Sequence, residues 1–174
     1  MGLKTLKIID IFIIFILCFP FHFMYNWFPN TLFSIMFPVN ESIWEHMKMI
    51  FSAFFAVGIL DYLFTKGNKN AFPNMFITSL ISIPTFLILY LPLYEIFGKE
   101  MFLNLAILLF TVIIVQIISY YILKTTETDN IVSISVIGII LVYILFGILT
   151  YYPLTNDIFH DSYNCKYGIN MYDN

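Results

Sequence analysis

Apolar residues occur along the chain in five long runs that short polar breaks separate. The runs cover residues 8–27, 43–64, 75–97, 101–123 and 131–152. An α-helix rises about 1.5 Å per residue, so about 20 apolar residues cross a hydrocarbon core of roughly 30 Å. The pattern therefore predicts an all-α integral membrane bundle of five transmembrane helices. Because the breaks are short, helices that follow one another in the chain should be antiparallel neighbours.

Two segments fall outside these runs. Residues 30–38 are too short to cross a bilayer but apolar enough to lie at its surface, which predicts a short interfacial or re-entrant segment after the first span. Residues 153–174 are polar and lack hydrophobic periodicity. The sequence therefore divides into a transmembrane domain, residues 1–152, and a polar tail, residues 153–174, which we expect to be solvated outside the membrane.

Composition supports a bilayer environment. Of the 174 residues, 60% are hydrophobic and only 11% are charged, which is too apolar for a water-soluble domain of this size. The net charge is −3 and all eight basic residues are lysines, so nucleic acid is not an expected partner. The first run continues past the usual length of a signal-peptide core and has no small-residue cleavage site after it, which indicates a retained span.

The lysines predict how the helices are oriented. With the N-terminus in the cytoplasm, five lysines lie inside (4, 7, 66, 69 and 124) and two outside (99 and 166). Short cytoplasmic loops are enriched in Lys and Arg, so this split predicts a bacterial cytoplasmic membrane protein with its N-terminus in and its C-terminus out. Five aromatic residues then gather at the outer interface, namely Tyr25, Trp27, Trp44, Tyr151 and Tyr152.

The densest polar cluster stands at the start of the second run. On a helix, Glu41, Glu45 and Lys48 would share one face, and Ser42 and His46 the adjoining strip. A structural interpretation covers part of this cluster, because Ser42-x-x-Glu45 fits the capping box that begins many helices. That interpretation leaves His46 and Lys48 without a role.

A histidine in the first span lies at a similar depth. His22 precedes the outer end of the first run by about as many residues as His46 follows the start of the second. Two histidines and a carboxylate suit zinc or another divalent transition metal, so His22, Glu41 and His46 are candidate metal ligands. The alternative is that His22 only forms a hydrogen bond inside the bundle. No short-spaced ligand motif such as His-Glu-x-x-His supports the metal.

Other ionisable residues have simpler interpretations. Asp10 and Asp61 lie near the inner boundary, where Lys7 can pair with the first and Lys66 with the second, so both are interpreted as structural. In the tail, Asp161 and its neighbours would contribute ligands only if the tail folded back over the bundle.

The run Pro38-Val-Asn-Glu-Ser-Ile-Trp-Glu-His-Met-Lys48 resembles the hallmark of a family of small bacterial polytopic membrane proteins known only as a domain of unknown function. The chain is also similar to that family in its His22–Trp27 stretch, and in a Phe-x-Asp element at Phe159 followed by Tyr-Gly-Ile at Tyr167. The resemblance covers nearly the whole chain and implies no activity.

Two functions remain open. The first is a membrane-embedded, metal-dependent hydrolase of a lipid-like substrate, with metal on His22, Glu41 and His46, Glu45 as general base and Lys48 stabilising negative charge. The second is a non-catalytic membrane subunit for small-solute binding, transport or assembly with a partner membrane protein. Its motivation is the small size of the chain and the lack of a complete catalytic motif.

Overall fold

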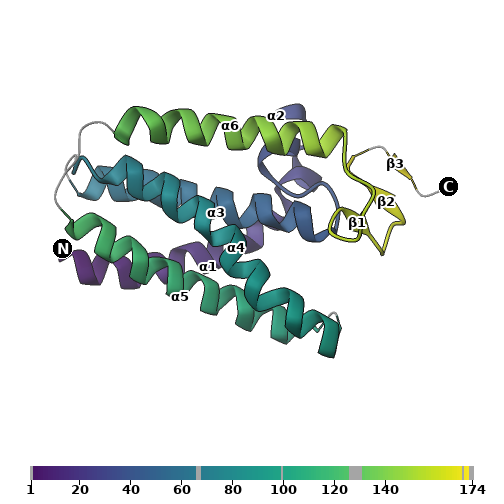
Figure 1. Ribbon diagram of the computed structural model, residues 1–174, viewed down its shortest axis with the longest axis horizontal. Coiled ribbons are helices and arrows are strands. Elements are labelled where there is room, and N and C mark those ends of the chain that lie inside the picture. Colours follow the sequence, from purple (N-terminus) through teal and green to yellow (C-terminus); the bar gives the residue numbers. More distant parts are fainter. Residues whose placement is uncertain (1, 66–67, 99, 126–130, 170, 173–174) are drawn as a thin grey trace.

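The computed structural model describes residues 2–65, 68–98, 100–125, 131–169 and 171–172. Six helices and three short strands follow one another along this part of the chain (Figure 1). The helices are α1 (Leu3–Trp27), α2 (Thr31–Met36), α3 (Ile43–Phe64), α4 (Ala71–Phe97), α5 (Met101–Lys124) and α6 (Ile131–Tyr151). The strands are β1 (His160–Asp161), β2 (Lys166–Tyr167) and β3 (Met171–Tyr172). All the helices except α2 are long and apolar enough to cross a membrane, which confirms the predicted fold class.

Four of the long helices form a ring. α1 packs on α3 and α5, and α4 packs on the same two helices, so each member of the ring has two neighbours. α6 lies outside the ring, against α4 and α2 (Figure 1). Buried apolar side chains from the ring fill its middle, among them Ile14, Phe54, Phe86 and Val112.

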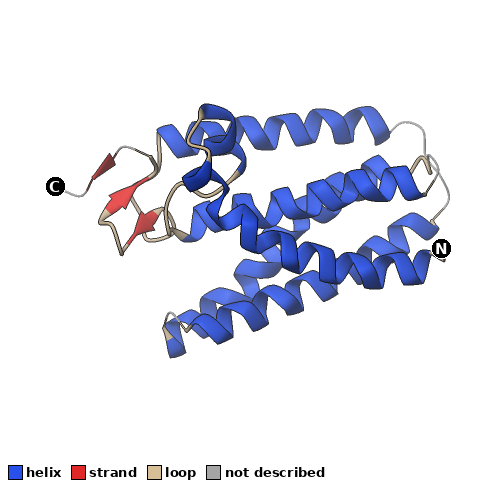
Figure 2. Cartoon of the chain, turned by 180° about the vertical axis from the view of Figure 1, so that it is seen from behind, coloured by secondary structure: helices blue, strands red, loops and turns tan. Residues whose placement is uncertain are grey.

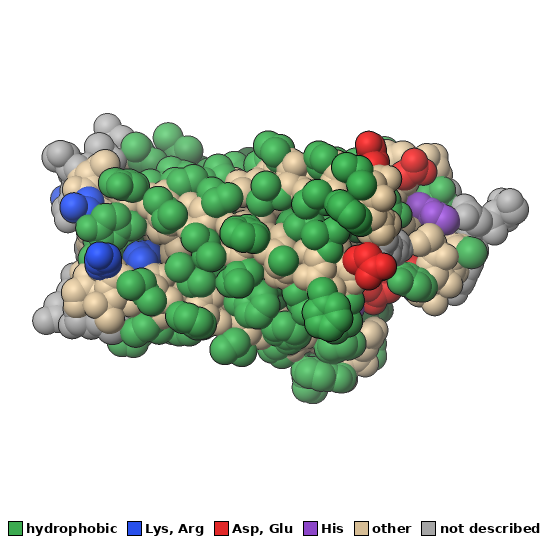
Figure 3. All heavy atoms as spheres, turned by 90° about the horizontal axis from the view of Figure 1, so that it is seen from below, with side chains coloured by type: hydrophobic (Ala, Val, Ile, Leu, Met, Phe, Trp, Pro, Cys, Tyr) green, Lys and Arg blue, Asp and Glu red, His purple; other side chains and the backbone are tan. Residues whose placement is uncertain are grey.

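The outer faces of the long helices are apolar. Figure 3 shows hydrophobic side chains over the length of the molecule, with lysines at the end where the N-terminus lies and acidic side chains and a histidine at the other. On α6, Ile134, Ile140 and Ile148 are all exposed. A soluble monomer rarely exposes so continuous an apolar surface, so these faces are the ones that contact lipid. We call the two ends of the bundle the N-terminal end and the sheet end.

The predicted interfacial segment is the short helix α2. Its N-cap is Asn30, whose side-chain oxygen accepts the Phe33 N–H at 3.1 Å. The buried Ser34 hydroxyl lies 3.1 Å from the Tyr151 hydroxyl at the end of α6. The Ser34 carbonyl accepts a hydrogen bond from the Lys48 ammonium at 2.7 Å. α2 is therefore fastened both to α6 and to the buried part of α3.

The tail is folded onto the bundle, which corrects the expectation that it is simply solvated. Its strands form an antiparallel sheet in the order β1-β2-β3 (Figure 2). Hydrogen bonds that hold the tail in place include those from Trp44 N to Ile158 O (2.9 Å), from Ile169 N to Thr150 O (3.1 Å) and from the Asn40 amide to Gly168 O (2.9 Å). The Trp44 ring also stacks on Phe159, with centroids 4.8 Å apart.

Charged residues at the N-terminal end form a buried cluster. Lys7 lies 2.9 Å from Asp10 and forms a second ion pair with Asp61. The first pair was predicted from the sequence. The partner suggested for Asp61 was Lys66, which lies outside the described residues. Because Lys7 is on α1 and Asp61 on α3, the cluster joins two members of the ring at this end.

Candidate metal centre

The start of α3 fixes the backbone that carries the candidate site. Ser42 is the N-cap, and its hydroxyl accepts the Glu45 N–H at 3.3 Å. The Asn40 side chain accepts the Ser42 N–H at 2.9 Å. Only half of the predicted capping box forms, because Asn40 takes the N–H that Glu45 would otherwise bind. Glu41 and His46 thus project from a hydrogen-bonded turn rather than from a loose loop.

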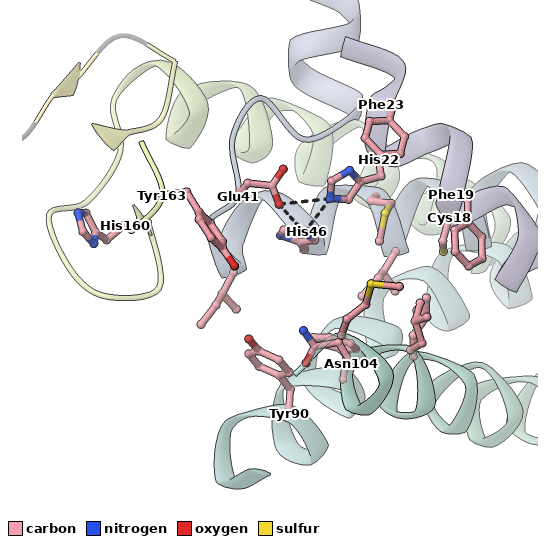
Figure 4. Close-up of a pocket in the computed structure, with 17 residues that line it drawn as sticks. Cys18, Phe19, His22, Phe23, Glu41, His46, Tyr90, Asn104, His160 and Tyr163 are labelled. Atoms are coloured by element: carbon pink, nitrogen blue, oxygen red, sulfur yellow. Dashed lines mark hydrogen bonds and ion pairs between the residues drawn. The ribbon is translucent and has the colours of Figure 1, made fainter. Parts of the chain in front are cut away.

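The structure brings the three proposed ligands together at the sheet end (Figure 4). His22 reaches them from the last part of α1. Its Nε2 atom lies 3.1 Å from Nε2 of His46 and 3.4 Å from Oε2 of Glu41, and the distance from His46 Nε2 to Glu41 Oε2 is 3.6 Å. All three side chains are partly exposed. The two histidines therefore face one groove, while their role as ligands stays a prediction.

Hydrogen bonds indicate which ring nitrogens of His22 and His46 could bind a metal ion. Nδ1 of His46 lies 2.7 Å from the Ser42 carbonyl oxygen, which can only accept, so Nδ1 carries a proton. In the neutral ring, Nε2 of His46 then presents its lone pair toward His22 and Glu41. Metal-ligating histidines are usually braced in this way. His22 is not, because its buried Nδ1 has no hydrogen-bond partner among the described residues.

The distances among the three candidate ligand atoms are close to those between atoms that bind one zinc ion. Ligand atoms about 2.0–2.1 Å from a tetrahedral zinc lie roughly 3.3–3.4 Å from one another. The observed separations of 3.1, 3.4 and 3.6 Å fall on both sides of that value. Shifts of a few tenths of an ångström would let all three atoms bind one ion, with a fourth position open to solvent.

The charge of the cluster also suits a divalent cation. The hydrogen bond from His22 holds the pKa of the Glu41 carboxyl below its ordinary value, although partial burial works in the opposite direction. Glu41 is therefore ionised at neutral pH. Two neutral imidazoles and one carboxylate carry a single negative charge, which a divalent ion would change to a single positive charge.

Asp161 connects the tail to the backbone of Glu41. Its buried carboxylate accepts the Glu41 N–H at 3.2 Å, the Tyr163 N–H at 2.9 Å and the Asn164 side-chain amide at 2.7 Å. Burial alone would raise the pKa of Asp161, but these hydrogen bonds, led by the one from Asn164, lower it. The tail thus supplies a brace for the backbone of Glu41 rather than a fourth ligand.

A cavity of about 530 Å³ adjoins the cluster, a volume within the range of small-molecule sites, roughly 300–1,000 Å³. Its polar lining consists of His22, Glu41, His46, Tyr90, Asn104, His160 and Tyr163. The remaining wall is mainly apolar and comes from all four helices of the ring, through residues such as Cys18, Ile50, Phe86 and Leu108. The Asn104 amide oxygen has no hydrogen-bond partner among the described residues. The centre therefore opens into the sheet end of the ring.

Glu45 and Lys48 lie elsewhere. They form an ion pair with each other and are absent from the cavity lining. Glu45 also accepts the Val39 N–H at 3.0 Å, and the Lys48 ammonium donates to the Ser34 carbonyl and the Thr150 hydroxyl, both at 2.7 Å. Both side chains are fully buried. Their proposed catalytic roles stay predictions, and this placement does not support them.

Several residues of the site do not stand out as site residues in the sequence. An amide in an apolar run, such as Asn104, predicts an interhelical hydrogen bond, and here it lines the cavity. Tyr163 and the bracing role of Asp161 had no signal, because both depend on how the tail folds. Thr150 is an ordinary threonine in sequence, and its contacts with Lys48 and with the Ile169 N–H of the tail depend on the tertiary fold.

Five helices able to cross a membrane, an apolar outer surface and a polar site at one end define a polytopic integral membrane protein. The chain belongs to the DUF6512 family, a family of unknown function, whose sequence model matches residues 2–169. No curated protein and no solved structure matches it. Membership covers nearly the whole chain and assigns no activity, so the function has to be argued from the site.

Proposed function

We propose that this chain is a membrane-embedded, metal-dependent hydrolase whose centre is a divalent ion, such as zinc, held by His22, Glu41 and His46. The observation that carries the proposal is that one ligand atom from each residue lies within 4.8 Å of the others. Three protein ligands with an open fourth position are typical of catalytic zinc, whereas structural zinc is usually closed by four.

The chemistry follows from the open position. A divalent ion held by His22, Glu41 and His46 would act as a Lewis acid and would make a water in the open position reactive near neutral pH. Hydrolysis of an ester would then join the water oxygen to the carbon or phosphorus and break the bond to the leaving oxygen, which would take one proton of the water, while the other would go to solvent. This sequence needs no contribution from the buried Glu45 and Lys48.

The lack of a brace on His22 predicts a limit on affinity. Metal binding requires the lone pair of Nε2, which places the proton of the neutral ring on Nδ1. That atom is buried without an acceptor among the described residues, and an unmade buried hydrogen bond costs about 1–3 kcal/mol. The centre should therefore bind zinc more weakly than one in which every histidine is braced.

Metal analysis of purified protein tests the proposal. Wild-type protein loaded with zinc and desalted should retain about one equivalent, and His22→Ala or His46→Ala should lose it. His160→Ala is the matched control, because His160 lines the same cavity outside the ligand cluster. Equal zinc in all four proteins, or none in any, would overturn the metal centre.

In that case the non-catalytic alternative, a subunit for solute binding, transport or assembly, would take its place. The observation that favours it is the closed Glu45–Lys48 pair, which leaves Glu41 as the one carboxylate that the described residues contribute to the cavity lining.

We further propose that the site faces outward from a bacterial cytoplasmic membrane, with the N-terminus inside. The separation of lysines from acidic residues along the molecule supports this orientation (Figure 3). Cys165 is exposed at the sheet end and Cys18 is buried. A membrane-impermeant thiol reagent applied to whole cells should label Cys165, and labelling only after lysis would reverse the orientation.

A further inference from the structure

The cavity beside the metal centre has two chemically different parts. The polar part surrounds His22, Glu41 and His46 at the sheet end. The apolar part continues between the ring helices toward the middle of the bundle, along Cys18 of α1 and Leu108 of α5, each about one helical turn deeper than the polar residue on its own helix. A ligand that fills both parts must be amphipathic.

The apolar part also reaches the lipid-facing surface. Three of its lining residues are too exposed to be enclosed by the cavity: Phe19 and Phe23 of α1 are 45% and 47% exposed, and Met101 of α5 is 68% exposed. A residue that both lines the cavity and faces lipid marks a place where the cavity meets the membrane. The geometry indicates a lateral opening between α1 and α5.

We propose that the cavity receives an acyl chain of a membrane lipid, which enters sideways between α1 and α5 and presents an ester group to the His22–Glu41–His46 centre. The inference rests on the proposed function for its chemistry and names the substrate class of that site. The loaded centre would carry one positive charge, which complements the carbonyl or phosphoryl oxygen of an ester. The unpartnered Asn104 oxygen offers an acceptor for a head-group hydroxyl.

Other occupants fit less well. A water-soluble solute would leave the apolar walls without a partner. A helix of another membrane protein is about 10–12 Å wide and would have to pass between α1 and α5, which pack against each other. An acyl chain is a single file of methylene groups and needs no such width.

Photochemical labelling in the membrane tests the route without relying on metal or turnover. The protein is stripped of metal with a chelator and placed in nanodiscs that contain phosphatidylglycerol with a diazirine on one acyl chain. In the wild type, labelled positions should concentrate on the cavity-facing residues of 18–23 and 101–108. Leu105→Trp, which fills the cavity, should lower labelling there at least about ten-fold.

The matched control is Leu109→Trp, one turn along α5, which is exposed and lies outside the cavity lining. It should leave the labelling unchanged. If Leu105→Trp is not monodisperse by size exclusion, Met101→Trp at the opening replaces it. Labelling spread evenly over the lipid-facing surfaces, or insensitive to the cavity-filling variant, would overturn the proposal even if zinc binds.

His46→Ala separates this inference from the proposed function. It should lose zinc but keep the labelling, because the apolar walls hold the chain. Zinc-loaded wild type then distinguishes the two ester classes. Cleavage of ordinary phosphatidylglycerol but not of its ether-linked analogue would assign a carboxylic ester, and cleavage of both would assign the phosphoric ester. Labelled protein that binds zinc and cleaves neither would refute the substrate assignment.

Discussion

Replacing Lys48 by methionine removes one charge from a fully buried ion pair while nearly keeping the length of the side chain. Lys48 is 0% exposed and Glu45 is 1% exposed. The ammonium group has three donors, and Glu45, the Ser34 carbonyl and the Thr150 hydroxyl accept from it. In Lys48→Met the Glu45 carboxylate stays buried, with only its weaker hydrogen bonds left to balance the charge.

Removing one partner of a buried ion pair costs about 3–5 kcal/mol of folding free energy, because the other charge is left without compensation. Glu45→Gln should destabilise for the same reason. The double variant leaves no buried charge, so it should lie within about 1–2 kcal/mol of the wild type, the cost of the hydrogen bonds to Ser34 and Thr150. The summed effect of the single changes should thus exceed that of the double variant by at least about 2 kcal/mol.

Reversible unfolding in mixed micelles, followed by circular dichroism, gives the three free energies. Lys124→Met serves as the control, since Lys124 is exposed at the end of α5 and its loss should change stability by less than about 0.5 kcal/mol. Additive single changes would refute the reasoning. A Lys48→Met protein that keeps its stability and its zinc but loses hydrolysis would instead return Lys48 to the catalytic role predicted from sequence.

Two further predictions concern the docking of the tail, which the fluorescence of Trp44 reports through its stacking on Phe159. Gly168 has φ +55°, and a Cβ there would lie 2.3 Å from the Thr150 carbonyl oxygen, so Gly168→Ala should undock the tail; an unchanged spectrum would contradict this. The pKa of Asp161 is lower in the folded protein than its ordinary value, so the stabilisation it gives is complete above about pH 4 and should be lost as the pH falls through the folded pKa. Asp161→Asn should remove this acid dependence, and an acid transition that persists in the variant would show that another group causes it.

Most of the fold follows from the length of the apolar runs, because a helix that crosses a bilayer needs about 20 apolar residues. The boundaries of α3 agree with the predicted run, 43–64. α1 begins earlier than its apolar run, at Leu3 rather than residue 8. A hydropathy pattern stops at charged residues, whereas helical hydrogen bonds do not, and here Lys7 is neutralised by Asp10 and Asp61.

The geometry of the polar cluster could be predicted only in part from the sequence. Helical spacing predicts that Glu41 and Glu45 share one face, but α3 begins only at Ile43, so the spacing rule does not apply to Glu41. As a result the two carboxylates separate, one toward His22 and His46, the other toward Lys48. Their similar depth in the membrane predicts that His22 and His46 lie near each other. The direction in which each glutamate side chain points depends instead on the residue at which α3 begins.

The tail could not be predicted from local pattern. Its strands are two residues long, too short for an alternating signal, and its position depends on contacts with residues more than 100 positions earlier, such as that of Gly168 with Asn40. Those contacts form only when all five spans are in place.

The hydrogen bond from the Glu41 backbone to Asp161 bears on biogenesis. The three proposed ligand residues leave the ribosome early, within the first 46 positions, while the Asp161 carboxylate that accepts the Glu41 N–H follows the fifth span. A nascent chain that has inserted its first helices therefore carries Glu41 without the Asp161 contact that braces its backbone. Full bracing of the candidate site has to wait for the chain beyond the last helix, so a stalled or clipped product would insert its helices and still lack this contact.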